Sequence, residues 1–350
     1  MAETTASRVS GPLPSPPERS PRSLSTGRAR RRYRTVVAVL TVLAAGFGFG
    51  LLVWDNPMPP GSDGFWRIAE LRGTNLVVMA VVAICQAVAT VSFQTVTGNR
   101  IITPSIMGFE ALYVVIQTTA VYFLGVAGLV AVQGVTQFTL QLAVMVGFAM
   151  LLYGWLLSGR YANLQIMLLI GIIIGGGLAS VSTFMQRLLT PSEFDVLAAR
   201  LFGNVSNADA SYLPVAIPLC LTASVLLWAS SRRLDVVALG RDASTGLGLN
   251  HRRETMRVLF LVSVLMAVST ALVGPMTFLG FLVATLAYQF ADSHDHRHVF
   301  PVAVLTCFVV LSGAYFVMRN IFYANGVVSI IIELVGGLVF LFVILRKGRL

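Results

Sequence analysis

The chain alternates long apolar runs with short polar breaks, a pattern that predicts membrane-spanning helices. Ten runs stand out: residues 35–53, 74–93, 104–124, 135–157, 164–185, 213–230, 256–274, 277–290, 299–318 and 327–345. A helix of about 20 apolar residues crosses the hydrocarbon core of a bilayer. Lipid leaves open backbone groups without hydrogen-bond partners, and the alternating pattern of barrel strands is missing from the sequence. We therefore predict an all-α, polytopic membrane protein with about ten transmembrane helices.

The polar breaks predict further, shorter elements. The run at 277–290 follows Gly274-Pro275 and is too short to cross comfortably, so we expect a partial or tilted helix packed against protein. Two loops on the predicted outer side, at 54–73 and 186–212, each contain a short amphipathic stretch and predict a short helix. The segment at about 231–255 is long, basic and rich in Gly, and we interpret it as a cytoplasmic coupling loop.

The first 34 residues differ in composition from the rest. They are rich in Pro, Ser and Arg, which predicts a disordered, basic, cytoplasmic N-terminal tail over 1–34, followed by one transmembrane domain over 35–350. A secretory leader would carry its apolar core closer to the start, so we do not predict a cleaved leader. The basic stretch that ends at Arg34 is interpreted as a topology anchor, in preference to a lipid-specific or regulatory site.

Composition and charge exclude a soluble fold and argue against nucleic-acid binding. The chain has 350 residues, of which 56% are hydrophobic and 11% charged, and a net charge of +10. The basic residues lie in short loops and at the ends of runs, where they set topology. With both termini cytoplasmic, most of them face inward, and those outside are Arg67, Arg72, Arg187, Arg200 and Arg319. The three cysteines lie inside apolar runs and are interpreted as core residues.

The coupling loop contains apolar residues that a solvated connection does not need. We predict that residues 239–250 form two short helical pieces, split at Gly246 and Gly248. Leu239, Leu247 and Leu249 would then form a small apolar face. The alternative interpretation is an ordinary solvated loop, which we favour less.

Several motifs occur in an order that resembles one family. QTVTGNRIITPSIMGFEA matches its Gln, Asn, Pro and Gly pattern at Gln94, Asn99, Pro104 and Gly108. LDVVALGRDASTGLGLN, VGPMTFLGFLVATLA, DHRHVFP and ELVGGLVFLFVILRKGR follow in order. Over roughly residues 66–350, the chain resembles the permease subunits of ABC importers for iron-siderophores, haem and cobalamin. Ala284-Thr285 replaces a common Pro-His, and Leu338 replaces a common Pro. The variant pattern favours the siderophore branch.

The resemblance implies a function and a set of partners. It implies a multi-pass subunit of the bacterial cytoplasmic membrane that moves a ferric siderophore. Its partners would be a second permease subunit, identical or homologous, two ATP-binding subunits and an extracytoplasmic substrate-binding protein, within membrane lipids. The sequence has no phosphate-binding P-loop, so ATP hydrolysis belongs to the partners, and we expect no cofactor, metal or nucleic acid.

The resemblance also assigns roles to particular residues. The ATPase would contact Leu239, Gly240, Asp242, Gly246, Leu247 and Gly248. The binding protein, through acidic residues, would dock on Arg72 and Arg319, with Arg67 as a weaker candidate. The alternative for these arginines is snorkelling to the membrane interface. The fifth and last spans would line a passage between two permeases, with Ser180, Thr183 and Met185 as wall residues.

Two carboxylates and a histidine cluster allow other interpretations. Glu110 and Glu333 lie inside spans, where a charge is costly, so each should face protein or water. They belong either to the translocation path or to the structure, and we favour structure. If they relay protons, the chain would instead be a proton-coupled secondary transporter. ADSHDHRHVF at 291–300 has alternating histidines that could bind zinc, although loop structure or motor contact fits better.

Overall fold

The protein was analysed as a computed structural model. The structure describes residue 24 and the ranges 26–54, 56–59, 61–131, 134–158, 164–205, 208–320 and 328–347. The predicted disordered tail at 1–34 lies mostly outside these residues. Helix α1 (Gly27–Val53) begins eight residues before the predicted first span at 35, so the last residues of the predicted tail are helical.

The described residues form helices joined by short connections. The long helices are α1 (Gly27–Val53), α2 (Asp63–Thr97), α3 (Phe109–Ala131), α4 (Val135–Ser158), α5 (Leu164–Gln186), α7 (Leu213–Ala229), α10 (His251–Val273), α12 (His296–Asn320) and α13 (Val328–Lys347). The shorter elements are η1 (Ser105–Met107), α6 (Pro191–Leu201), η3 (Ala210–Tyr212), α8 (Ser231–Val237), α9 (Arg241–Gly246) and α11 (Leu279–Ala291). The predicted all-α fold is confirmed.

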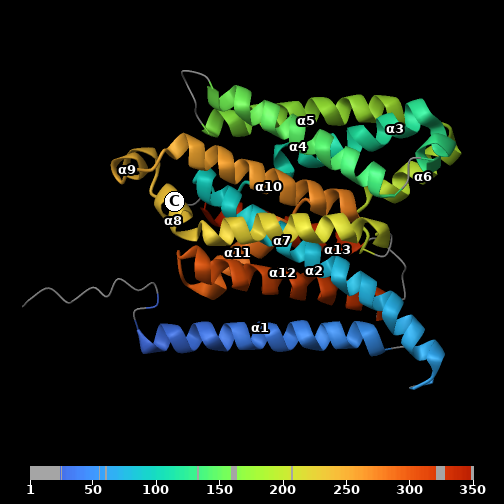
Figure 1. Cartoon of the computed structure of the whole chain (residues 1–350), viewed down its shortest axis with the longest axis horizontal. Helices are drawn as coiled ribbons and strands as arrows, with labels where there is room; N and C mark the ends of the chain where they lie inside the picture. Colours follow the sequence, from blue (N-terminus) through green and yellow to red (C-terminus); the bar gives the residue numbers. More distant parts are fainter. Residues whose placement is uncertain are drawn as a thin grey trace, which may run out of the picture.

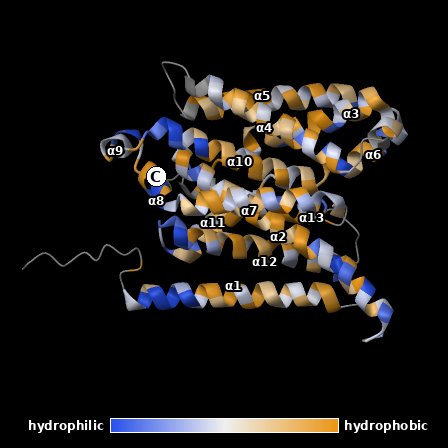
Figure 2. Cartoon of the chain, viewed as in Figure 1, coloured by the Kyte–Doolittle hydropathy of each residue, from blue (hydrophilic) through white to orange (hydrophobic). Residues whose placement is uncertain are grey.

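Eight of these helices are long and apolar enough to cross a membrane, while α11 (Leu279–Ala291) and the stretch Ser329–Phe342 within α13 are apolar but shorter. The predicted short eighth run therefore corresponds to α11. The last run corresponds to α13, which is 20 residues long. The described residues do not establish ten complete crossings. In Figure 2 the hydrophobic residues occupy the middle of the bundle and the hydrophilic residues its two ends.

Helices α2 and α10 form the centre of the bundle. In the most apolar 18-residue stretch of each helix, 78% of the residues are buried in α2 and 72% in α10, compared with 17% in α1. α2 packs against α10, α12 and α7, whereas α1 lies at one edge beside α12, and α3, α4 and α5 lie toward the opposite edge (Figure 1). The exposed side chains of α1, α4, α5 and α13 are largely apolar, as expected for surfaces that meet lipid or another subunit.

The two predicted outer helices have different outcomes. α6 confirms the second, and a capping box begins it: the Thr190 hydroxyl accepts from Glu193 N, and the Glu193 carboxylate accepts from Thr190 N. The Thr190 backbone N–H and the Thr190 hydroxyl both donate to the exposed Glu193 carboxylate, and these two hydrogen bonds lower the pKa of that carboxyl. The first predicted helix is not separate, because residues from Asp63 onward continue α2 without a break. Helix α2 is therefore 35 residues long and extends beyond the predicted span at 74–93.

Glycines allow the close crossings that fix the bundle. A Cβ on Gly175 of α5 would lie 3.0 Å from the Cα of Gly108, at the start of α3. A Cβ on Gly336 of α13 would lie 2.7 Å from the Cβ of Phe278, just before α11. Both contacts require the absence of a side chain, so the Gly-rich fifth run is explained by helix packing.

Candidate functional site

A compact projection of two short helices stands at one end of the bundle (Figure 1). Helix α8 follows α7 after a single residue, Ser230, and α9 leads into α10 through residues 247–250. Gly240 separates the two short helices with φ of 94°, a backbone conformation that strains any residue with a side chain. Helix α9 ends in a Schellman arrangement, in which Gly248 has φ of 83° and the Leu249 N–H donates to Ser244 O at 3.0 Å.

The predicted pair of helical pieces is therefore displaced along the chain. Residues 239–250 contain one short helix, α9, and the second piece is α8, which lies before Leu239. The prediction placed the break at Gly246 and Gly248, but the helix-to-helix bend is at Gly240. Gly246 is the last residue of α9, and Gly248 ends the turn that follows.

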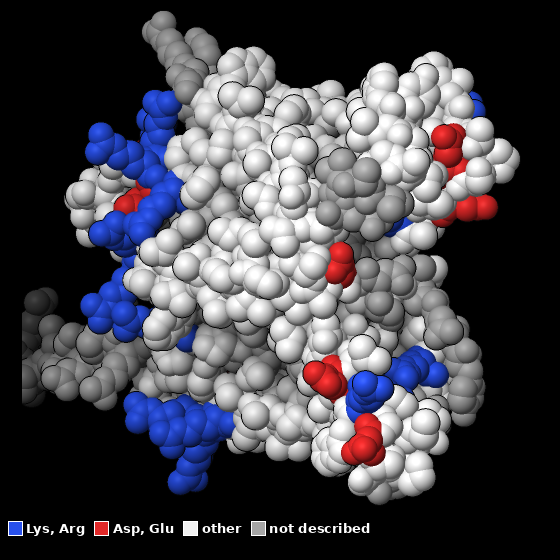
Figure 3. Space-filling view, turned by 45° about the vertical axis from the view of Figure 1, so that its right-hand side comes forward, with Lys and Arg blue, Asp and Glu red and all other residues white. Residues whose placement is uncertain are grey.

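Exposed apolar side chains occupy the projection, as the sequence predicted. Leu239 and Leu247 are each 64% exposed, and Leu249 is partly buried. Asp242 is exposed in the first turn of α9, where a negative charge favours the helix dipole. Arginine side chains surround this face, and Figure 3 shows Lys and Arg gathered at this end of the molecule while few charged side chains lie at its middle.

The projection is fastened to α10. The Arg233 guanidinium of α8 pairs with the Glu254 carboxylate at 2.9 Å. The buried Ser244 hydroxyl of α9 lies 2.9 Å from His251 Nδ1. Helices α8 and α9 are thus held in one arrangement, which an ordinary solvated loop would not be.

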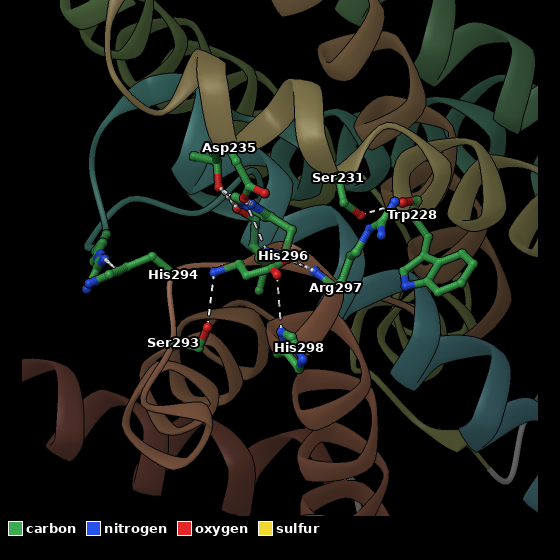
Figure 4. A network of polar contacts seen from close by, with 12 residues as sticks. Trp228, Ser231, Asp235, Ser293, His294, His296, Arg297 and His298 are labelled. Atoms are coloured by element: carbon green, nitrogen blue, oxygen red, sulfur yellow. Dashed lines mark hydrogen bonds and ion pairs between the residues drawn. The ribbon is translucent and has the colours of Figure 1, made fainter. Parts of the chain in front are cut away.

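The histidine-rich segment beneath α8 distributes its side chains among different helices (Figure 4). His296 Nδ1 lies 2.5 Å from the Asp235 carboxylate on α8. His294 Nδ1 lies 3.2 Å from the Arg100 guanidinium, and the His298 ring packs edge-on against Tyr33 of α1. These separate contacts fit the favoured interpretation as loop structure or motor contact, and no group of three metal-ligating side chains occurs among the residues that the structure describes.

The three predicted docking arginines lie in different environments near the opposite end. Arg67 is exposed on the first turns of α2, and Arg319 is partly exposed in the last turn of α12. Arg72 is only 7% exposed, and its Nη1 donates to Trp54 O at 2.8 Å and to Leu52 O at 3.4 Å. A cation there neutralises the carbonyl end of α1. In this conformation Arg72 has a structural contact and no exposed charge, so its docking role stays a prediction that the geometry does not favour.

Glu110 forms hydrogen bonds with the segment between α10 and α11. Its partly buried carboxyl group accepts from the Met276 N–H at 3.1 Å and from the Thr277 hydroxyl at 2.5 Å. Both donors belong to the Gly274–Phe278 segment, where the helical hydrogen-bond pattern is interrupted. Glu110 therefore supplies acceptors that the broken backbone lacks, which supports the structural interpretation over a proton relay. Glu333 is partly buried on α13.

The predicted wall residues of α5 do not share one face. Ser180 and Thr183 are exposed and line a hollow of about 400 Å³ together with Phe184 and Arg187. Met185 points away from it, since its sulfur accepts from the Thr119 hydroxyl of α3 at 3.9 Å. Arg187 is the residue that the sequence analysis missed: it was counted only as an outer charge, although its spacing of four from Thr183 places both on one helix face.

A second hollow, of about 430 Å³, lies where α3, α4 and α6 meet. Three amide side chains inside apolar runs line it: Gln117, Gln137 and Gln141. The Gln117 amide donates to Gln141 at 2.9 Å. Glutamines are uncommon in lipid-facing helices, and their presence inside two apolar runs is the signal that could have located this polar cavity.

One protein family and several curated relatives match most of the chain in sequence. The FecCD transport family matches residues 31–346. The chain is 49% identical to the petrobactin import system permease protein FatC of Bacillus anthracis, over 95% of this chain and 94% of that protein. It is 35% identical to the petrobactin import system permease protein YclO of Bacillus subtilis (strain 168), over 75% of this chain and 84% of that protein.

A solved structure has the same fold. It is a metal-chelate type ABC transporter in an inward-facing conformation, with a TM-score of 0.75 and 21% sequence identity. The match covers 90% of this chain and 99% of that one.

Proposed function

This chain belongs to the FecCD transport family, and we propose that it is the permease subunit of an ABC importer that carries a ferric siderophore of the petrobactin type inward. It acts in the bacterial cytoplasmic membrane with both termini cytoplasmic. A second permease, identical or homologous, two ATP-binding subunits and an extracytoplasmic binding protein complete the importer. The chain itself does no covalent chemistry.

One observation carries this proposal: the ordered projection of α8 and α9. Leu239 and Leu247, each 64% exposed, lie close together in sequence on an ordered segment that is too polar to enter lipid, and covering both with a partner would remove apolar surface from water. We assign this face to a cleft of an ATP-binding subunit, with Asp242 and the surrounding arginines at the polar rim. The positive charge gathered at this end supports its assignment to the cytoplasm (Figure 3).

The passage is assigned to the exposed faces of α5 and α13. Both helices expose large apolar side chains along their length, among them Ile173 and Leu334, each 64% exposed. A second permease would cover these faces and leave the hollow at Ser180 and Thr183 between the two subunits. A wall of small hydroxyl and apolar groups binds a large chelate weakly enough for release.

The binding protein is assigned to the α6 end. Arg67 and Arg319 have exposed or partly exposed guanidinium groups there, which suit acidic residues on the two lobes of that protein. Such pairs steer the encounter and fix its register more than they add affinity.

We expect Arg187→Gln to lower uptake about three- to tenfold when the chelate is limiting, because an exposed cation beside the hollow attracts an anionic ferric complex. Arg187→Lys keeps the charge and should retain most of the activity. The difference between the two variants should shrink in high salt, which screens exposed charges. Equal uptake by the Gln and Lys variants in low salt would remove Arg187 from the passage.

The proposal is tested by reconstitution. The chain is co-expressed with the ATP-binding subunits and partner permease from its own genome and placed in proteoliposomes with the loaded binding protein. We expect chelate entry only with ATP present. Uptake driven by a proton gradient without ATP would support the secondary transporter instead, but the role of Glu110 at the helix break does not favour that candidate.

A further inference from the structure

A chain of polar contacts runs from the projection into the centre of the bundle. Asp235 of α8 accepts from His296 twice, from its ring Nδ1 at 2.5 Å and from its backbone N–H at 3.3 Å. His296 Nε2 then lies 2.6 Å from the Thr95 hydroxyl of α2. Figure 4 shows Asp235 and His296 facing each other beneath α8. Three helices that are distant in sequence therefore meet at one imidazole.

Two of the three side chains in this chain of contacts are buried, and the third, Asp235, is partly exposed. The Asp235 side chain is 34% exposed, whereas His296 is 4% exposed and Thr95 is 8% exposed. The Thr95 hydroxyl also lies 2.8 Å from Val91 O, inside α2. A carboxylate only accepts hydrogen bonds, so Nδ1 donates to Asp235 whichever way the Thr95 hydroxyl is turned. Hydrogen bonds shielded from water are costly to break without a replacement.

The Asp235–His296–Thr95 contact joins the projection to two helices that are not next to it in the sequence. The projection is continuous in sequence with α7 and α10, so movement of α8 and α9 reaches those two helices directly. Helices α2 and α12 have no such covalent connection to it. Asp235 joins α8 to the first residue of α12, and His296 joins that residue to the last turns of α2.

The first turn of α12 is itself rigid. Asp295 precedes the helix, and its carboxylate accepts from the Arg297 N–H at 2.9 Å, which caps the start of α12. The Asp295 N–H donates to the Ser293 hydroxyl at 3.2 Å, which orders the preceding turn. The His296 ring also packs against Phe300 one turn later, at 5.5 Å between centroids. A displacement applied to His296 is therefore passed to the helix and is not absorbed by a loose loop.

We propose that Asp235, His296 and Thr95 form a transmission link that makes α2 and α12 follow the movement of the α8–α9 projection. The inference rests on the proposed function, since it assumes that an ATP-binding subunit moves the projection. These three are positioning residues: they contact neither nucleotide nor chelate. With the link broken, the projection moves α7 and α10 while α2 and α12 do not follow. ATP is then hydrolysed with less chelate moved.

The test is the number of chelates moved per ATP hydrolysed in the reconstituted importer. His296→Phe keeps a flat ring and loses both hydrogen-bonding nitrogens, and Asp235→Ala removes the acceptor at a partly exposed position where no core cavity results. For both variants we expect the ratio to fall about tenfold, the equivalent of one charge-assisted hydrogen bond. Hydrolysis without binding protein and assembly with the ATP-binding subunits should stay within about twofold of the wild type.

Conservative variants and a matched control separate transmission from stability. His296→Asn places an amide near the Nδ1 position and His296→Gln places one near Nε2, so each should recover part of the ratio. Ser269→Ala removes another buried hydrogen bond of α2, from the Gln86 amide at 3.1 Å, with no partner in the projection. It should lower thermal stability and leave the ratio unchanged.

The outcomes are distinct. A wild-type ratio in both His296→Phe and Asp235→Ala overturns the link, as does an equal loss of ratio in Ser269→Ala. Failure of the unmodified complex to transport with ATP counts against the proposed function itself, before any variant is compared.

Discussion

Leu247→Asp is expected to abolish uptake while the chain still inserts and folds. The side chain is 64% exposed, so its replacement removes little from the core. A carboxylate in the cleft of an ATP-binding subunit would instead be buried without a partner, which costs roughly 3 kcal/mol or more. That corresponds to a loss of affinity of about a hundredfold. The loss of transport is measured as uptake of iron-labelled chelate by cells that lack other importers. Retained insertion is measured as the amount of chain in the membrane.

The matched control for this variant is Asn250→Asp. It adds the same charge three residues away, and aspartate replaces asparagine as an N-cap of α10 with little change in stability. It should import normally. If Asn250→Asp and Leu247→Asp lose uptake equally, added charge explains the defect and the apolar face does not. Normal uptake by Leu247→Asp would remove that leucine from the contact.

The second large effect is expected for Glu110→Ala, which should destabilise the fold. The variant leaves the buried Met276 N–H and the partly buried Thr277 hydroxyl without their acceptor at the helix break. An unsatisfied buried polar group costs about 1–3 kcal/mol, so the Met276 N–H alone predicts a loss of that size, and the partly exposed Thr277 hydroxyl adds a smaller amount. Thermal unfolding of the purified chain in mild detergent measures the change, and less intact protein in the membrane is expected to accompany it.

Glu110→Gln and Glu333→Gln test the origin of that effect. Glutamine keeps a carbonyl oxygen at position 110 that can accept from one of the two donors, so the loss should be about half that of alanine. Glu333→Gln makes the same chemical change at the other carboxylate inside a span and should have a smaller effect. A stable Glu110→Ala chain that fails only in transport would return Glu110 to the translocation path.

The sequence predicts the helical elements well, because length and apolarity alone decide what can cross a bilayer. It also predicts α11 as a short helix, because the apolar run there is too short for a full span and follows Gly274-Pro275, which interrupts the backbone hydrogen bonds. It predicts a short helix in the loop at 54–73, but it misses that this helix is continuous with the span and forms the first turns of α2, because the stretch from Asp63 is too polar to be read as part of an apolar run. In the structure Ser62 caps that stretch, with its hydroxyl accepting from Phe65 N at 3.2 Å.

Side-chain partners distant in sequence explain most of what the sequence could not give. Glu110 was identified as unusual, but its donors lie 166 and 167 residues away, and no local pattern connects them. Arg72 resembles any arginine at the mouth of a span until α2 brings it against the end of α1. His296 was grouped with its neighbours by spacing, whereas the fold separates them and joins His296 to α8 and α2.

The central claim is that the α8–α9 projection faces the cytoplasm and meets an ATP-binding subunit, and cysteine labelling at Leu247 tests it most directly. The three native cysteines are buried, so Leu247→Cys introduces an accessible thiol at an exposed position. A membrane-impermeant thiol reagent should label this variant in inside-out vesicles and not in intact cells, and bound ATP-binding subunit should block the labelling. Labelling from outside intact cells, or labelling that the subunit does not reduce, would contradict the account.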